Sequence, residues 1–355
     1  MTKVAIAKCE NYELNEVKKA INILIRNTDF PEVKGKKILL KPNVLSDAEP
    51  DKAITTNPVV LKAIIQILKE KEVKEILVGD SPANHHKNFK PTGCGLYQVC
   101  EEENVEWIDF TISPIKKKLD IVNQNIYMCK IIDEVDMVFS LSKFKTHTLM
   151  LTTGSVKNIF GLVPNLRKSQ QHVLHPSRGS FAKMICGLFK EAKVTYTIMD
   201  AIVGMEGAGP GNGDPIKVNK LIGSNNALAV DIAQATMMGY DPMDIPIISC
   251  GLENRITSLT SIDDIEYPLY NANSLIMKDY NRIGGYVSNN EIDNEYMLRP
   301  TPIFNPDKCI KCMKCVNICP AKALVMKDKI IIDVDKCIRC YCCHEVCPVD
   351  AIDVK

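Results

Sequence analysis

The sequence predicts an α/β domain with a mostly parallel sheet, followed by a small, cysteine-rich α+β module. Two observations predict this organisation. Short apolar runs alternate with amphipathic helical segments over residues 1–262, as in a parallel sheet covered on both faces. Nine of the 15 cysteines then fall within residues 303–355. Residues 263–302, where the periodicity fades, are predicted to form an arm and linker between the two parts.

Each predicted strand of the first domain is a short apolar run, and each predicted helix has apolar residues at helical spacing. The strands are expected at residues 4–7, 37–40, 76–78, 105–109, 135–141, 194–199 and 220–222. The helices are expected at residues 14–26, 97–103, 180–190 and 227–238, with two more beginning near residues 57 and 155. Runs such as Ile38-Leu39-Leu40 favour strands that are buried on both faces.

Four groups of polar residues directly follow predicted strands. They are Lys41 with Asn43, Asp80 with Ser81, Lys143 with Lys145 and His147, and Asp200 with the loop after it. Open α/β sheets bind ligands beyond the carboxyl ends of their strands. We therefore expect the four groups to line one crevice.

The predicted crevice is cationic, because Lys41, Lys143, Lys145 and Lys157 all fall in or near it. The run before Lys157 and Asn158 resembles a helix N-terminus, whose free N–H groups suit an anion. A carboxylate or phosphate ligand is the favoured interpretation, and solvated lysines are the alternative. The neighbouring lysines would lower the pKa of His147, which is either an acid/base group or a structural histidine.

Residues 204–213 contain five glycines, including Gly207 and Gly209. Such a loop lets the backbone approach a ligand closely. It is not a P-loop, since no G-K-[ST] follows, and it lacks a dinucleotide-binding fingerprint. We expect either a lid over the crevice or a plain turn.

The histidines of the first domain offer a weaker possibility, a metal site. His85, His86, His172 and His175 could combine with oxygen ligands, for which the candidates are Asp80, Asp200, Glu206 and Asp214. Polar loop residues without a metal are the favoured alternative.

The cysteine-rich module contains the spacing C-x2-C-x2-C-x3-C-P twice, and this spacing holds pairs of [4Fe–4S] clusters. The fourth cysteine of each run ligates the other cluster. The first predicted set is therefore Cys309, Cys312, Cys315 and Cys347, and the second is Cys337, Cys340, Cys343 and Cys319. A zinc site would use two separated cysteine pairs, and a disulfide framework would suit a secreted chain. Cys342 falls outside the pattern, as a bystander or as a competitor of Cys343.

The module reads as an internal repeat with basic residues among its cysteines. The segment D-K-C-I-K-C at Asp307 recurs as D-K-C-I-R-C at Asp335. Basic side chains at Lys308, Lys311, Lys314, Lys336 and Arg339 offer either a docking face for an acidic partner or an ordinary solvated surface.

Composition excludes several classes of protein. The 355 residues are 46% hydrophobic with a net charge of +1, which gives no argument for nucleic acid or a membrane surface. No apolar run is long enough for a membrane span, and the N-terminal residues do not resemble a signal peptide. The overall cysteine pattern favours a reducing cytoplasm, in an anaerobic or oxygen-poor cell.

Several motifs of the first 250 residues together resemble the DUF362 family. They are K-P-N at Lys41, G-D-S-P at Gly79, S-K-F-K-T-H at Ser142, S-V-K-N-I-F-G-L-V-P at Ser155 and M-D-A-I-V-G-M-E-G at Met199. The module resembles the bacterial two-cluster ferredoxin. The resemblance implies the domain layout and the positions of the site, and it supplies no reaction.

These observations favour an iron–sulfur redox protein, for which a ferredoxin-linked reductase is the expected enzyme class. The module would relay electrons between a low-potential partner protein and an anionic substrate or cofactor, such as a flavin, in the crevice. His147, Lys143 and Lys145 are the expected catalytic residues. The expected ligand-binding residues are Lys41, Asn43, Asp80, Ser81, Lys157, Asn158, Asp200, Gly207 and Gly209. The alternatives are a non-catalytic electron-transfer subunit of a larger oxidoreductase and, less favoured, an iron–sulfur sensor or cluster-delivery factor.

Overall fold

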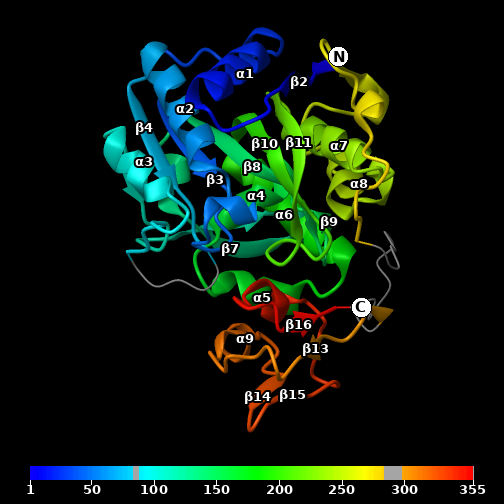
Figure 1. Ribbon diagram of the computed structural model, residues 1–355. Helices are drawn as coiled ribbons and strands as arrows, with labels where there is room; N and C mark the ends of the chain where they lie inside the picture. The colour runs from blue at the N-terminus through cyan, green and yellow to red at the C-terminus, as the bar shows by residue number, and fades with distance from the viewer. Residues whose placement is uncertain (83–87, 284–297, 355) are drawn as a thin grey trace.

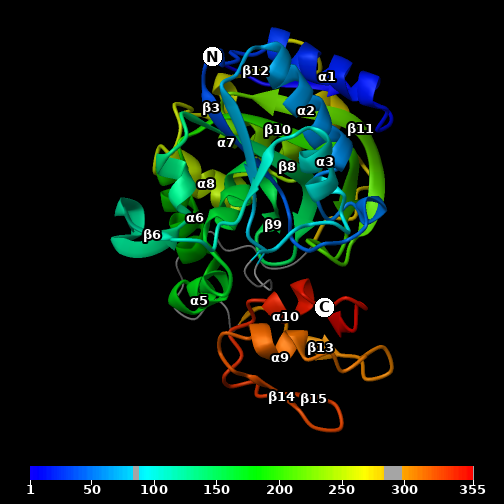
Figure 2. The ribbon, with the colours of Figure 1, turned by 90° about the vertical axis from the view of Figure 1, so that its left-hand side faces the viewer.

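A computed structural model describes residues 1–82, 88–283 and 298–354. The chain forms an α/β domain with a small module attached at one end, as Figure 1 shows. The module lies beyond one end of the strands of the central sheet, and its β14–β15 hairpin (Leu324–Met326 and Ile330–Ile332) points farthest from the α/β domain (Figures 1 and 2).

The central sheet has the strand order β2-β11-β10-β8-β3-β4-β5, with the short β9 paired to the end of β8. Strands β10, β8, β3, β4 and β5 are parallel, whereas β11 is antiparallel to both of its neighbours. The mostly parallel sheet expected from the sequence is therefore confirmed. The bounds are β2 Ala5–Lys8, β3 Lys37–Pro42, β4 Glu75–Gly79, β5 Glu106–Ile108, β8 Met137–His147, β9 Leu151–Thr152, β10 Val194–Glu206 and β11 Asp214–Ser224.

Helices cover both faces of the sheet, and alternate residues of each strand enter two separate cores. Ile38 and Leu40 pack on the face that carries α1 Leu14–Arg26, α2 Pro58–Glu70 and α3 Leu96–Glu102. Leu39, which lies between them, packs on the opposite face. The opposite face carries α4 Gly154–Asn158, α6 Arg178–Ala192, α7 Ala227–Met237 and α8 Pro246–Glu253.

The remaining elements lie at the borders of this domain. They are the β1–β12 pair (Thr2–Lys3 and Ile265–Glu266), the hairpin β6–β7 (Ile115–Leu119 and Gln124–Met128) and α5 (Arg167–Leu174).

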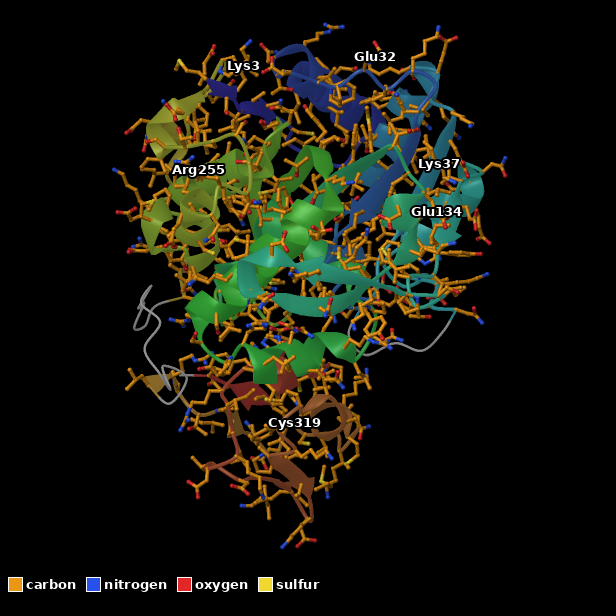
Figure 3. The ribbon with its side chains drawn as sticks, turned by 180° about the vertical axis from the view of Figure 1, so that it is seen from behind. Lys3, Glu32, Lys37, Glu134, Arg255 and Cys319 are labelled. Atoms are coloured by element: carbon orange, nitrogen blue, oxygen red, sulfur yellow. The ribbon has the colours of Figure 1, made fainter. Side chains whose placement is uncertain are left out.

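The module is built from two short antiparallel pairs and two short helices. A small core of Leu324, Ile330, Cys343 and Ile352 holds them together, and Figure 3 places Cys319 within this part of the chain. The bounds are β13 Ile303–Phe304, α9 Lys314–Ile318, β14 Leu324–Met326, β15 Ile330–Ile332, α10 Cys342–Glu345 and β16 Ile352–Asp353. Strand β13 pairs with β16, and β14 pairs with β15.

Two strands extend well beyond their expected ends. Strand β8 continues through Lys143, Lys145 and His147, which the sequence placed after a strand. Strand β10 passes Asp200 and continues to Glu206, with a shift of register between Asp200 and Met205. These polar residues are therefore inside the sheet, where neighbouring strands fix their side chains.

Among the described helices, none combines the length and apolar character that crossing a membrane requires.

Candidate functional site

A cavity of about 420 Å³ lies where the carboxyl edge of the sheet meets the module. Residues after β3 and β4 form one wall, and residues of α9, α10 and the segment after α10 form the facing wall. The sequence-predicted residues that line it are Asn43, Asp80, Ser81, Lys157 and Asn158. The module contributes Lys314, Ile318, Cys342, Glu345, Val346, Cys347 and Pro348. The cavity therefore brings together residues expected after two of the strands with Lys157 and Asn158, and the module forms its facing wall.

Lys157 is the cation best placed to meet a ligand in this cavity. It is half-buried on α4, and within the described part of the chain its Nζ has no hydrogen-bond or ion-pair partner. Burial lowers the pKa of Lys157, and the nearby Glu345 opposes this effect. An anionic ligand would supply the partner that the ammonium group lacks.

Two unpaired polar oxygens face the same space. Thr153 is 5% exposed and lines the cavity, and its Oγ1 has no partner among the described residues. The Oδ1 of Asn43 also has no partner there, although its Nδ2 donates to Asn158 Oδ1 at 3.2 Å. Buried polar atoms are normally hydrogen-bonded. These two atoms therefore indicate a polar ligand or water.

Lys168 and His172 of α5 complete this wall. Lys168 Nζ donates to the carbonyl oxygens of Ser81 and Val163, and burial lowers its pKa to about 7. His172 stacks on Phe181 with ring centroids 4.4 Å apart, and burial lowers its pKa to about 3. His172 is therefore neutral at pH 7.

Lys41 and Asp80 form a buried ion pair beneath the cavity, with Nζ 2.9 Å from Oδ1. The other carboxylate oxygen of Asp80 accepts the Val44 N–H at 2.7 Å. Gly161 packs directly on this pair, and a Cβ at this position would collide with both charged groups. Lys41 thus neutralises Asp80 and does not line the cavity.

Lys143 and Asp200 lie deeper in the sheet and also satisfy each other. Lys143 Nζ is 2.7 Å from Asp200 Oδ2, and both side chains are fully buried. Tyr12 donates to Asp200 Oδ1 at 2.9 Å and accepts from Lys143 at 3.1 Å. The sequence grouped this pair with the crevice, whereas in the structure the pair connects β8, β10 and the segment before α1.

Lys145 and His147 point from β8 toward the junction with the module. Lys145 Nζ donates to the carbonyl oxygens of Ile54 and Pro210, at 2.6 and 3.2 Å. Burial drives the pKa of Lys145 and of His147 well below their ordinary values, and Lys157 adds to both effects.

The tautomer of His147 follows from its backbone contact. The Leu149 N–H donates to His147 Nδ1 at 3.1 Å, so a neutral ring carries its proton on Nε2. That nitrogen lies 3.4 Å from Glu345 Oε1 of the module, and Glu345 lines the cavity. His147 therefore reaches the cavity only through Glu345.

The sequence suggested that the N-terminus of α4 binds an external anion, but a side chain of the protein occupies this position. The Asp231 carboxylate accepts the N–H groups of Ser155 and Val156, at 2.5 and 3.0 Å. Burial raises the pKa of Asp231 to about 7. The expected anion is thus a side chain of the protein, and Lys157 is left as the cationic contribution of this helix to the cavity.

The glycine-rich segment is the turn of the β10–β11 hairpin. Thr146 Oγ1 donates to Gly207 O at 2.9 Å, and Thr148 Oγ1 donates to Gly209 O at 2.6 Å. Its tip reaches the module, where Asn212 Nδ2 donates to His344 O at 3.0 Å. Gly211 and Asn212 line the cavity, whereas Gly207 and Gly209 do not. The segment forms a fixed wall and a connection between the two parts.

Two further cavities inside the module each bring together one predicted set of cysteines. The first is lined by Cys309, Cys312, Cys315 and Cys347. The second is lined by Cys319, Cys337, Cys340 and Cys343, with Cys342 also in its wall. Each fourth cysteine crosses to the other half of the repeat, as the sequence predicts for a two-cluster module.

The surroundings of these cysteines suit iron–sulfur clusters. The Ala323 N–H donates to Cys319 Sγ at 3.3 Å, and the Ala351 N–H donates to Cys347 Sγ at 3.2 Å. Such contacts stabilise sulfur that carries negative charge. Apolar side chains, including Phe304 and Ile352 in one cavity and Leu324 in the other, exclude water.

The structure gives no support to a metal site in the first domain. In the described ranges, no group of three or more His, Cys, Asp or Glu side chains converges on a position for a single metal ion. The predicted candidates His85 and His86 lie outside the described residues.

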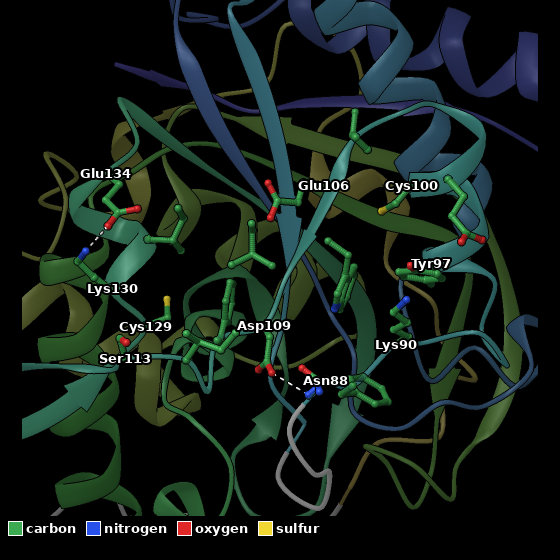
Figure 4. A pocket seen from close by; sticks show the side chains of 18 residues that line it. Asn88, Lys90, Tyr97, Cys100, Glu106, Asp109, Ser113, Cys129, Lys130 and Glu134 are labelled. Carbon is green, nitrogen blue, oxygen red and sulfur yellow. Dashed lines mark hydrogen bonds and ion pairs between the residues drawn. The ribbon is translucent and has the colours of Figure 1, made fainter.

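A larger groove of about 650 Å³ runs along the edge strand β5 and α3, as Figure 4 shows. Several of its charged side chains engage each other, the backbone or an aromatic ring. Lys130 pairs with Glu134 at 2.8 Å, and Asp109 Oδ2 accepts the Asn88 N–H at 2.8 Å. No predicted site residue lines this groove. The cavity at the module is the better candidate because it combines an unpaired cation with a predicted cluster ligand.

Sequence reasoning missed Thr153, Lys168 and Glu345. Lys168 and His172 belong to a polar helix without an apolar stripe, and α5 was not predicted. Glu345 stands between Cys343 and Cys347, so the module motif could have indicated its place near the clusters. Nothing in the sequence indicated that it approaches His147.

Comparisons with known proteins agree with the two-part organisation. Residues 308–351 match the 4Fe-4S dicluster domain. The "Thylakoid-associated protein sll1697" of Synechocystis is 27% identical over 247 residues, which cover 69% of this chain and 76% of that protein.

Two solved structures show a limited likeness. A protein from Thermotoga maritima has a TM-score of 0.39 at 12% identity, covering 59% of this chain and 54% of that chain. The lactate racemase apoprotein from Thermoanaerobacterium thermosaccharolyticum has a TM-score of 0.38 at 13% identity, covering 64% of this chain and 55% of that chain. This chain thus spans about half the length of each.

The family expected from the motifs is confirmed over more than half of the chain. Residues 38–236 match the domain of unknown function DUF362, so the chain belongs to the DUF362 family and carries an iron–sulfur module after that domain.

Proposed function

We propose that this protein is an iron–sulfur redox protein whose module exchanges electrons with a small anionic molecule in the cavity between its two parts. One observation carries the proposal: Lys157 and the predicted cluster ligand Cys347 line the same cavity. A ligand held by Lys157 would lie beside a cysteine of the first predicted set.

We assign two [4Fe–4S] clusters to the module, with the two cysteine sets that line its cavities as ligands. When bound, these clusters take up and release single electrons. Cys347 lines both the first cysteine cavity and the ligand cavity, and Cys342 is shared between the second cysteine cavity and the ligand cavity. Each cysteine cavity therefore shares a wall residue with the ligand cavity.

The residues of the α/β domain bind and orient the ligand in this proposal. Lys157 Nζ pairs with its negative charge, and the Thr153 hydroxyl and the Asn43 amide contact its polar groups. His147 holds Glu345 in place against the cavity. The module covers the open side, which excludes water and strengthens the charge interactions inside.

Carboxylates, phosphates and the phosphate of a flavin share the charge that Lys157 recognises. Mass spectrometry of small molecules released from anaerobically purified protein identifies which is present. A stoichiometric anion supports the proposal. Protein with full iron and sulfide but an empty cavity favours the non-catalytic electron-transfer subunit instead.

Replacing Lys157 tests the anion site directly. Lys157→Met should weaken binding about 10- to 100-fold, because a charge-assisted hydrogen bond contributes about 1.5–3 kcal/mol. Calorimetric titration with a panel of small carboxylates and phosphate esters measures the effect. Lys157→Arg should retain part of the affinity, and Lys116→Met, an exposed site on β6, should retain all of it. Equal affinity in all three variants would remove the anion site from the proposal.

A further inference from the structure

The two halves of the module repeat differ in their exposure to solvent. In the first half, Ile310, Lys311 and Cys312 are exposed, and Ile310 retains 60% of its accessible surface. The equivalent residues of the second half, Ile338, Arg339 and Cys340, are all partly covered. The two similar sequences therefore have different surroundings. Among the described cysteines, Cys312 of the first loop is the only predicted cluster ligand that is exposed to solvent.

The segment before the module accounts for this difference. Tyr341 donates to Pro300 O at 3.0 Å, and Arg339 Nε donates to Thr301 Oγ1 at 3.4 Å. Pro302 also lines the second cysteine cavity. Residues 300–302 thus cover the second loop, whereas the first loop has no equivalent cover from the described residues.

Basic residues surround the exposed loop. The run 307–314 contains Lys308, Lys311 and Lys314 against one acidic residue, Asp307. All three lysines are exposed, and none forms an ion pair within the described ranges. In the second half, by contrast, Lys336 pairs with Asp333 at 2.7 Å. The exposed loop therefore carries three lysines without an ion pair next to Ile310 and Cys312.

The exposed loop connects to the ligand cavity through the first cysteine set. Residues 310–314 and Cys347 line one cysteine cavity, and Cys347 also lines the ligand cavity. Solvent, the first predicted cluster position and the ligand cavity therefore follow one another across the module. The second cysteine set has no equally exposed member.

We propose that residues 308–314, with Ile310 at the centre, form the docking surface for an acidic one-electron carrier protein, which exchanges one electron at a time with the first cluster. This inference rests on the proposed function, since it requires assembled clusters. The lysines attract an acidic surface and speed encounter, and the exposed Ile310 provides an apolar contact at the centre. Each transfer oxidises the carrier by one electron and reduces the module by one.

The test measures the rate at which a reduced, acidic flavodoxin reduces the anaerobically purified holoprotein, by stopped-flow absorbance at low ionic strength. Lys308→Glu combined with Lys311→Glu should slow the reaction at least tenfold, and added salt should reduce the difference. Lys327→Glu with Lys336→Glu introduces the same charge change elsewhere on the module, at the β14–β15 turn and before the second loop, and should alter the rate less than twofold. Lys314 is left unchanged because it lines the ligand cavity.

Two further readouts separate the possible failures. Iron and sulfide counts of each variant establish whether the clusters are assembled, and a deficit in the unmodified protein would contradict the proposed function itself. Reduced methyl viologen, a cation, should react with the first variant at least as fast as with the unmodified protein. With the clusters intact, three results would show that the docking surface is wrong. Both double variants could slow reduction by flavodoxin equally, the Lys327/Lys336 variant could slow it more, or neither variant could slow it.

Discussion

At the scale of single residues, burial controls the charge of the groups around the cavity. Lys168 and His172 both lie in its wall, and desolvation is the largest cause of the lowered pKa of each. The same effect acts on Lys157. A ligand that brings negative charge would favour the protonated forms of both lysines, so binding and protonation are coupled.

His172 should make the protein less stable in mild acid. Its pKa is about 3 when folded, with Lys157, Arg299 and His175 adding to the effect of burial, and its ordinary value is 6.5. Between these values the unfolded chain binds the proton and the folded chain does not. The free energy of unfolding therefore falls as the pH drops below 6.5, by about 2 kcal/mol at pH 5.

His172→Phe keeps an aromatic ring against Phe181 and removes the titrating group. Urea unfolding at pH 7 and pH 5 should show a smaller loss of stability in this variant than in the unmodified protein. Equal losses would mean that His172 does not titrate in this range.

At the scale of elements, the sequence predicted well where apolar spacing was clear. The expected helix 14–26 coincides with α1, and Asn57 caps α2 by accepting the Val59 N–H at 2.9 Å. It failed where polar residues are part of regular structure. Lys143 and Asp200 resemble loop residues in the sequence, but each neutralises the other inside the sheet. That pairing joins residues 57 positions apart and has no local signal.

The contact between Asp231 and α4 is the element-level feature that sequence reasoning misassigned. Asp231→Ala would leave the N–H groups of Ser155 and Val156 buried without an acceptor. The free energy of unfolding should fall by about 2 kcal/mol, the cost expected for a lost cap and buried unpaired donors. Because α4 carries Lys157, anion binding should weaken as well.

Asp231→Asn retains one acceptor oxygen and should lose less stability than Asp231→Ala. Thermal or urea unfolding of the two variants measures the difference. If Asp231→Ala were as stable as the unmodified protein, the carboxylate would not be the group that holds the start of α4.

At the scale of the whole molecule, function in this proposal depends on contact between the two parts. The sequence indicated both parts and several residues of the crevice. It could not show that the module itself closes the crevice, because the contacts join residues far apart in the chain. Asn212 reaches His344, and His147 reaches Glu345, across the junction. These contacts place Cys347 in the wall of the ligand cavity.

Asn212→Ala should loosen this junction without affecting the clusters. The lost hydrogen bond contributes about 1 kcal/mol, so the population of separated parts should rise about fivefold. Amide hydrogen exchange should quicken in α10 and around the cavity, with iron content unchanged, while Asn125→Ala on the exposed side of β7 should have no such effect. Because separation takes Cys347 away from Lys157, electron exchange with the bound anion should slow in Asn212→Ala, whereas reduction of the module by flavodoxin should not. If exchange with the anion were unchanged despite faster hydrogen exchange, electrons would not require the closed arrangement, and the shared cavity would not be the place of reaction.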